Sequence, residues 1–117
     1  MAADGQRIAR QRIDLVAGNP DIWVDDLARG TRVRVTASDE PDMLPVWSPD
    51  HTRVAYVNGN SPGRPGRRRL AIAAADGTGV LRTIPCAAHD GDYCEPTDWS
   101  VDGKQLLVNV LSAKSRS

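Results

Sequence analysis

The chain repeats one short signal three times, and this repeat constrains the fold more than any other feature. Each copy is an aspartate-led turn that enters a strand-prone run, at residues 4–8, 50–54 and 102–106. The aspartates at positions 4, 50 and 102 are therefore 46 and 52 residues apart. This spacing is typical of one four-stranded propeller blade or a similar supersecondary unit. The repeat predicts an array of similar units.

A second repeated unit lies between these turns. Residues 21–36 read DIWVDDLARGTRVRVT and residues 69–84 read RLAIAAADGTGVLRTI, each with a glycine-containing turn between two strand-prone runs. Both copies are typical of a β-hairpin. Long segments with helical spacing of apolar residues are missing, whereas short β-prone runs bounded by Gly, Pro, Asn or Asp recur. The sequence therefore predicts an all-β fold.

The strand pattern can be assigned to blades whose strands are named A to D from the centre outward. Residues 37–84 form one complete blade, residues 1–36 supply strands B, C and D of the blade before it, and residues 85–117 supply a linker and strands A and B of the next. We therefore predict a partial β-propeller of about two four-stranded antiparallel blades, starting and ending inside blades. The predicted strands are 6–13, 21–27, 31–36, 44–48, 51–58, 68–74, 79–84, 96–100 and 104–111.

Charge and hydropathy limit the partners that the chain can take. Fifteen basic and fifteen acidic residues cancel, so no net field favours nucleic acid, anionic lipid or an acidic substrate. No apolar run approaches the roughly 20 residues that span a bilayer. The first ten residues lack the apolar segment of a secretory signal. Neither nucleic-acid binding nor a membrane span is predicted.

The repeated motifs resemble those of a known family. The runs PVWSPDHTRVAYV and PTDWSVDGKQLLV, preceded by DIWVDDLARGTRVRVT, resemble the WD-like repeats of TolB-type β-propellers. More narrowly, residues 12–36 followed by PVWSPD and PTDWSVDG resemble the propeller region attached to bacterial eukaryotic-type serine/threonine protein kinases. His51 stands where the family usually has the turn glycine, and Val101 where it usually has proline. Family propellers have six or so blades, and this chain holds little more than two.

Four residues occupy the structural positions of the repeat. Trp47 and Trp99 are expected in the core between packed blades, and the alternative is a ligand-facing surface. Asp50 and Asp102 are expected to accept backbone N–H bonds within their own turns. Because these aspartates belong to different blades, a paired-carboxylate active site is not expected. No catalytic residue is predicted, since neither repeated serine has a nucleophile-elbow context.

Two loop clusters carry other chemistry. Cys86, His89, Asp92 and Cys94 are residue types that bind zinc, but no Cys-x-x-Cys pair is present. A disulfide between Cys86 and Cys94 and unlinked loop residues both remain open, and no metal site or cofactor is predicted. A basic run can hold a phosphate or an acidic partner, or can be a solvated loop. The run consists of Arg64, Arg67, Arg68 and Arg69.

These observations favour a binding role over catalysis. The predicted function is a non-enzymatic propeller fragment that acts as a protein-interaction or ligand-sensing module. The resemblance implies that partners or ligands meet the loop-rich faces, and one reading places the parent protein in the periplasm or elsewhere outside the cytoplasm. The alternative is the accessory, substrate-filtering propeller of a prolyl oligopeptidase-type serine peptidase. An open fragment exposes apolar faces and strand edges, so we also expect self-association or a requirement for neighbouring blades.

Overall fold

The computed structural model describes residues 7–13, 20–36, 41–59, 69–85 and 93–111. In this part of the chain every regular element is a β-strand, so the predicted all-β fold is confirmed. Each predicted strand coincides with an observed one to within three residues at either end. The strands are β1 (Arg7–Ile13), β2 (Pro20–Asp26), β3 (Thr31–Arg34), β4 (Asp42–Trp47), β5 (Arg53–Asn58), β6 (Arg69–Ala74), β7 (Val80–Pro85), β8 (Tyr93–Trp99) and β9 (Leu106–Leu111).

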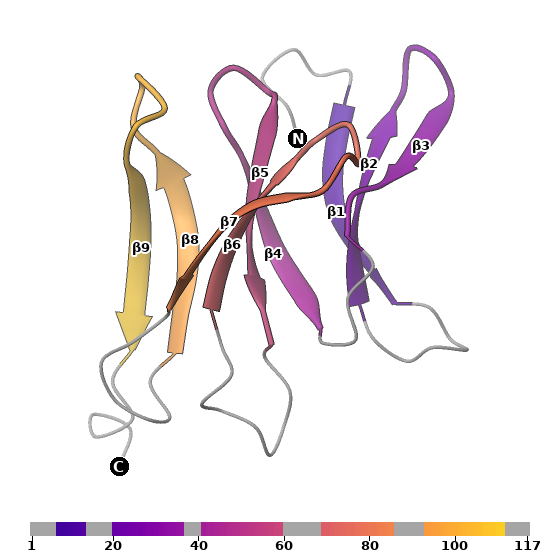
Figure 1. Ribbon diagram of the computed structural model, residues 1–117. Coiled ribbons are helices and arrows are strands. Elements are labelled where there is room, and N and C mark those ends of the chain that lie inside the picture. The colour runs from indigo at the N-terminus through magenta and orange to yellow at the C-terminus, as the bar shows by residue number, and fades with distance from the viewer. Residues whose placement is uncertain (1–6, 14–19, 37–40, 60–68, 86–92, 112–117) are drawn as a thin grey trace.

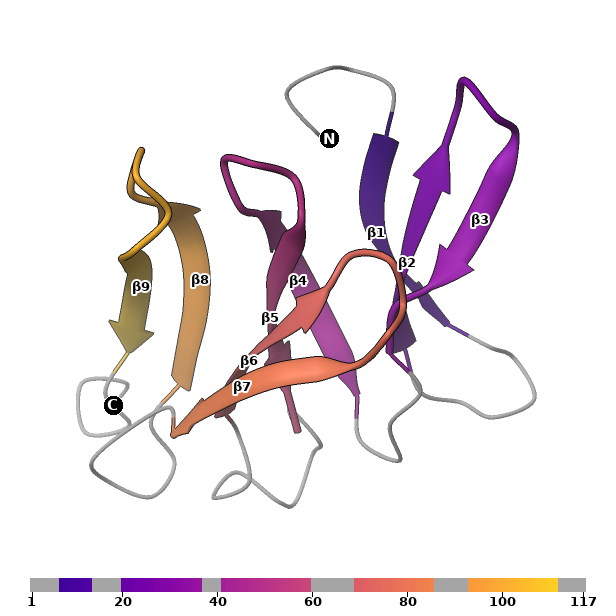
Figure 2. The ribbon, with the colours of Figure 1, turned by 45° about the horizontal axis from the view of Figure 1, so that its top comes forward.

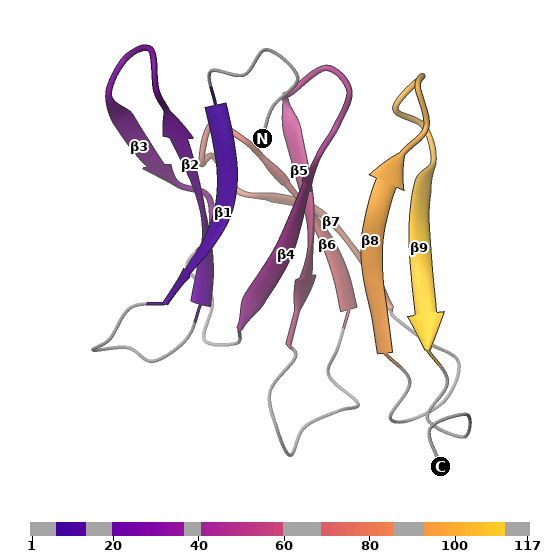
Figure 3. The same cartoon turned by 180° about the vertical axis from the view of Figure 1, so that it is seen from behind.

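The strands form three antiparallel sheets, which stand side by side (Figures 1 and 3). The first sheet has the order β1-β2-β3, the second β4-β5-β6-β7 and the third β8-β9. Sheet order follows chain order, as in a propeller whose blades are meanders. The segments that join the sheets include 37–40 and 86–92, which lie outside the described residues. The division into units 1–36, 37–84 and 85–117 therefore stays a prediction.

Strands β4 and β8 begin two to three residues earlier than predicted, because both contain an irregularity at a proline. The β4–β5 register shifts between Met43 and Val46, around Pro45, and the β8–β9 register shifts between Pro96 and Asp98. Proline cannot donate to a ladder, and a bulge is where a strand tolerates it. The predicted strands begin at Leu44 and Pro96, at or next to the proline. The observed strands also include two or three residues before that point.

The core lies between the sheets, in two layers on either side of the second sheet. Val54 and Tyr56 of β5 pack with Ile22 of the first sheet. Ala55, one residue along β5, packs on the opposite face with Trp99 of the third sheet. Because successive strand residues point to opposite faces, a strand covered on both sides is apolar throughout. This explains why β5 from Val54 to Val57 is buried at every position.

The hairpin of β6 and β7 leans across to the first sheet (Figure 2). Its turn contains Gly77 at φ +84°, and a Cβ there would lie 2.9 Å from Val33 Cγ1 and 3.2 Å from the Arg34 carbonyl oxygen of the first sheet. Glycine adopts this backbone conformation without steric cost and permits the close approach. Gly77 thus joins two sheets at a point where a side chain does not fit.

We expect Gly77→Ala to destabilise the chain by roughly 2–3 kcal/mol, since it adds both a left-handed backbone and an inter-sheet clash. Gly30 is the matched control, because it has φ +64° and nothing within 4 Å of an added Cβ. Gly30→Ala should cost about 1 kcal/mol, for the backbone alone. Urea denaturation followed by circular dichroism measures both variants, and equal costs would contradict the inter-sheet contact.

No helix long and apolar enough to cross a membrane occurs among the residues that the structure describes.

Candidate functional site

In the two repeated turns that the structure describes, the aspartate accepts hydrogen bonds from residues of the same turn. Asp50 Oδ1 accepts hydrogen bonds from Ser48 Oγ (2.7 Å), Thr52 N (3.1 Å) and Thr52 Oγ1 (2.8 Å). Asp102 Oδ1 accepts from Ser100 Oγ (2.6 Å) and Lys104 N (3.0 Å). Each carboxylate is held by donors of its own turn, which is a structural arrangement. His51 has φ 60° at the position where Gly103 has φ 74°, so the two turns share a backbone shape despite the different residue.

These turns make stability sensitive to acid. The hydrogen bonds from Ser48 and Thr52 lower the pKa of Asp50 from 3.8 to about 2. The folded state therefore binds fewer protons than the unfolded state between these values, so stability falls as the pH drops from about 4 to about 2. We expect Asp50→Asn to remove part of this acid dependence. Urea midpoints at pH 5.5, 3.5 and 2.5 measure it, and identical slopes for the two proteins would contradict the assignment.

An arginine of one sheet makes a cation–π contact with a tryptophan of the next sheet, and this contact occurs twice. The Arg7 guanidinium lies 4.8 Å from the Trp47 ring centroid, and Arg7 Nη2 donates to the His51 carbonyl at 3.0 Å. The Arg53 guanidinium lies 4.7 Å from the Trp99 ring centroid. Its Nη2 donates to a turn carbonyl in the same way, that of Gly103 at 3.2 Å. We call each contact an Arg–Trp clamp.

The two tryptophans are not buried equally. Trp99 is 7% exposed, and its Nε1 donates to the Val46 carbonyl at 3.2 Å. Trp47 is partly buried at the edge of the first core layer, and its Nε1 has no hydrogen-bond partner in the described part of the chain. The third copy of the repeat carries Gln105 where Arg7 and Arg53 stand. The sequence signal for the clamp is an arginine at the same position of the first two copies, Arg7 and Arg53.

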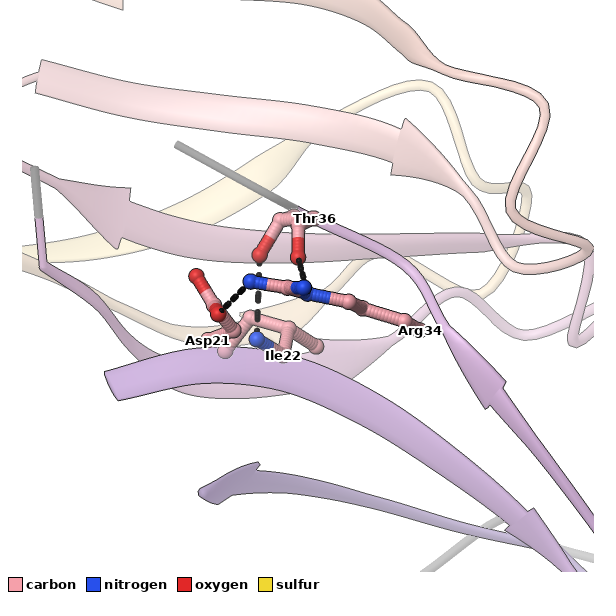
Figure 4. Close-up of polar contacts among 4 residues, drawn as sticks. All are labelled: Asp21, Ile22, Arg34 and Thr36. Carbon is pink, nitrogen blue, oxygen red and sulfur yellow. Dashed lines mark hydrogen bonds and ion pairs between the residues drawn. The ribbon is translucent and has the colours of Figure 1, made fainter. Parts of the chain in front are cut away.

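A partly buried polar network lies at the end of the first hairpin (Figure 4). Asp21 is 3% exposed and forms an ion pair with Arg34. Arg34 Nε donates to the Thr36 carbonyl at 3.1 Å, and Thr36 Oγ1 accepts from Ile22 N at 3.0 Å. These contacts tie the first residues of β2 to the residues that follow β3.

The network continues across the sheet boundary through Asp42, which is fully buried. Asn58 Nδ2 donates to Asp42 Oδ1 at 2.5 Å, and Arg69 Nε donates to Asn58 Oδ1 at 2.9 Å. Burial raises the pKa of Asp42, and the hydrogen bonds from Asn58 and Thr36 oppose this shift. None of these contacts was predicted from the sequence. The second hairpin has Arg69 and Ile84 where the first has Asp21 and Thr36, and that difference was a readable signal.

The remaining predicted residues are only partly described. Arg69 begins β6 and is exposed, whereas Arg64, Arg67 and Arg68 lie outside the described residues. Cys94 is fully buried, and the described part of the chain holds no free cysteine. Because Cys86 lies outside the described residues, as His89 and Asp92 do, the Cys86–Cys94 bridge stays a prediction. Among described residues, no group of three His, Cys, Asp or Glu side chains could hold a metal ion.

Apolar side chains are exposed along β9. Leu107 is 59% exposed, Val108 37% and Val110 53%. Leu107 lies on one face of the strand, and Val108 and Val110 lie on the other. Among the described strands β9 pairs only with β8, so one of its edges has no strand beside it in this part of the chain.

No family model matches the chain. The chain is similar to the Tol-Pal system protein TolB of Alcanivorax borkumensis, with 36% identity over 84 residues. These residues are 71% of this chain and 18% of TolB, so the chain spans less than a fifth of the relative's length. The similarity and the three consecutive antiparallel sheets together support a TolB-like β-propeller architecture for this chain.

Proposed function

We propose that the chain is a non-enzymatic part of a β-propeller that acts by binding protein. The observation that carries this proposal is the apolar surface of β9, with Leu107, Val108 and Val110 exposed on an edge strand. An edge strand of this composition pairs readily with another strand. The relative's name places TolB in a Tol-Pal system, which supports a role in protein assembly.

The second sheet indicates what covers such a strand. Its strand β5 is paired on both sides, by β4 and β6, and is buried from Val54 to Asn58. Strand β9 follows the same repeated turn as β5, but among the described residues only β8 pairs with it. We propose that a further strand, from a second copy of the chain or from neighbouring blades, completes this sheet.

We expect the purified chain to self-associate at tens of micromolar, and light scattering after size exclusion measures this. The double variant Leu107→Lys, Val110→Lys places a charge on each face of β9 and should yield a monomer. Val101→Lys is the matched control, because Val101 is 95% exposed but lies in the turn before β9. A folded monomer of the unmodified chain, or equal loss of association in the control, would reject the proposal.

The finer family assignment is also a proposal: the parent protein carries this propeller next to a bacterial serine/threonine kinase domain. It is supported by the resemblance of residues 12–36 and of PVWSPD to those propellers. The complete open reading frame tests it. An adjacent α/β-hydrolase domain in place of a kinase would identify the peptidase accessory propeller instead.

A further inference from the structure

A cavity of about 410 Å³ lies between the first and second sheets. Its volume falls within the range of about 300–1,000 Å³ that small-molecule sites occupy. Val35 and Thr36, which belong to the first hairpin, line it together with residues of the second sheet and its β6–β7 turn: Tyr56, Asn58, Arg69, Ala71, Gly79, Val80 and Thr83. The cavity is therefore built by both sheets.

The cavity exists because one position of the repeat carries a small residue. In the first sheet Trp23 is paired with Arg10 and Arg34, and in the second sheet Ala71 is paired with Tyr56 and Thr83. The two copies of the hairpin place Ala71 at the position of Trp23. A large side chain there would fill the space, and alanine leaves it open.

The contact of Gly77 with the first sheet holds the cavity in shape. The β6–β7 turn lies against Val33 and Arg34, so the hairpin reaches from the second sheet to the first (Figure 2). Gly79 and Val80 follow that turn directly and line the cavity. The segment that contributes Gly79 and Val80 to the lining is therefore in contact with both sheets.

Three of the polar side chains that line the cavity, Tyr56, Arg69 and Thr83, can donate hydrogen bonds to a ligand. Arg69 lines the cavity and donates through Nε to Asn58, and the Nη atoms of its planar guanidinium are further donors. Burial and the Asp42 charge raise the pKa of Tyr56, so its hydroxyl keeps its proton. Thr83 adds a second hydroxyl to the lining of the cavity. Asp42, the nearby buried acid, is fully covered and is not among the lining residues.

We propose that this cavity binds a carboxylate attached to a small apolar group. The guanidinium of Arg69 and the hydroxyls of Tyr56 and Thr83 would hold the carboxylate, because an arginine fork and neutral hydroxyl donors match its acceptor oxygens. Val35, Ala71 and Val80 would enclose the apolar group. The same chemistry is present in a free small acid and at the C-terminus of a peptide that ends in an apolar residue. The inference rests on the proposed binding role and names the ligand chemistry of one surface.

Nuclear magnetic resonance titration of the 15N-labelled full chain tests the proposal with defined probes. 3-Phenylpropionate represents the free acid, and N-acetyl-Gly-Phe with a free carboxylate represents the peptide terminus. The neutral controls are 3-phenylpropionamide and the amidated peptide. We expect saturable shifts at Thr36, Ala71 and Thr83 with at least one acid, and at least tenfold weaker binding of its amide. Binding of one acid alone identifies the source of the carboxylate. No saturable shift, or equal binding of acid and amide, would overturn the proposal.

Variants separate the cavity from the rest of the surface. Ala71→Leu should fill the cavity and abolish the shifts, and Arg69→Gln should weaken binding at least tenfold. Arg82→Gln is the matched control, because Arg82 is also an exposed strand arginine but lines a different cavity. Thr83→Val removes a hydroxyl without changing volume and serves if Ala71→Leu does not fold. Equal binding by the Arg69 and Arg82 variants would reject the site. Association through β9 is measured separately by light scattering, so failure of one proposal is distinguishable from failure of the other.

Discussion

Trp99→Ala is expected to destabilise the chain by about 3–5 kcal/mol, the range for removing a buried aromatic side chain. Trp99 is 7% exposed, packs with Ala55 and Ile72 of the second sheet, and donates its indole N–H to Val46. Its removal leaves a cavity between two sheets and releases Arg53 from its clamp. Equilibrium urea denaturation followed by circular dichroism measures the loss.

Trp47→Ala is the matched comparison, since Trp47 stands in the same clamp one repeat earlier. It is only partly buried and its indole N–H has no partner in the described part of the chain, so about half the apolar transfer and cavity loss is expected, roughly 2 kcal/mol. Arg53→Gln removes only the cation and its hydrogen bond to Gly103, and should cost about 1 kcal/mol. Equal losses for the two tryptophans would show that both contribute alike to inter-sheet packing.

Asn58→Leu is expected to cost about 2–3 kcal/mol at pH 7, because it removes one of the two side-chain donors, Asn58 and Thr36, that hydrogen-bond the buried Asp42 carboxylate. Burial already raises the pKa of Asp42, and the hydrogen bond from Asn58 opposes this shift, so removing Asn58 raises the pKa further. A raised folded pKa means that stability falls as the pH rises through it. The variant should therefore lose more stability at pH 7.5 than at pH 4.5.

The control for this experiment removes the charge itself. In an Asp42→Asn background, Asn58→Leu no longer removes a donor from an ionised group, and the pH-dependent part of the cost should disappear. Urea midpoints for the four proteins of the double-mutant cycle, measured at both pH values, isolate the coupling. A cost for Asn58→Leu that is the same at pH 4.5 and pH 7.5 would contradict the pH dependence assigned to Asp42.

The strands and hairpins could be predicted from the sequence because their signals are local. The β-prone run of β5 and the glycine turns at Gly30 and Gly77 identify each element from its neighbours in the chain. The early starts of β4 and β8 could not be predicted in this way, since a bulge at a proline interrupts the pattern without ending the strand.

The polar network and the cavity depend on differences between copies of the repeat. Trp47 and Trp99 could be predicted because the copies of the repeat share them. The positions at which the copies differ were not used for prediction. Asp42 and Asn58 meet at the ends of two paired strands, and only sheet register brings them together. Ala71 lines a cavity because Val35 and Thr36 of the first hairpin line it as well. That arrangement depends on the tertiary structure and cannot be predicted from the sequence.

The two boundaries of the second sheet are chemically unlike, and this specifies the order of the sheets. The boundary with the first sheet includes the hydrogen-bonded Asp42, whereas the boundary with the third sheet has Cys94 at the matching position of the repeat, packed on Val57 and Leu70. Exchanging the neighbours would place the buried Asp42 carboxylate against an apolar surface and remove its hydrogen bond from Thr36 of the first hairpin, leaving only Asn58 of its own sheet as a partner. The side chains at each boundary therefore match one particular neighbouring sheet. The order of the sheets matters for stability, even though the repeated units share one backbone shape.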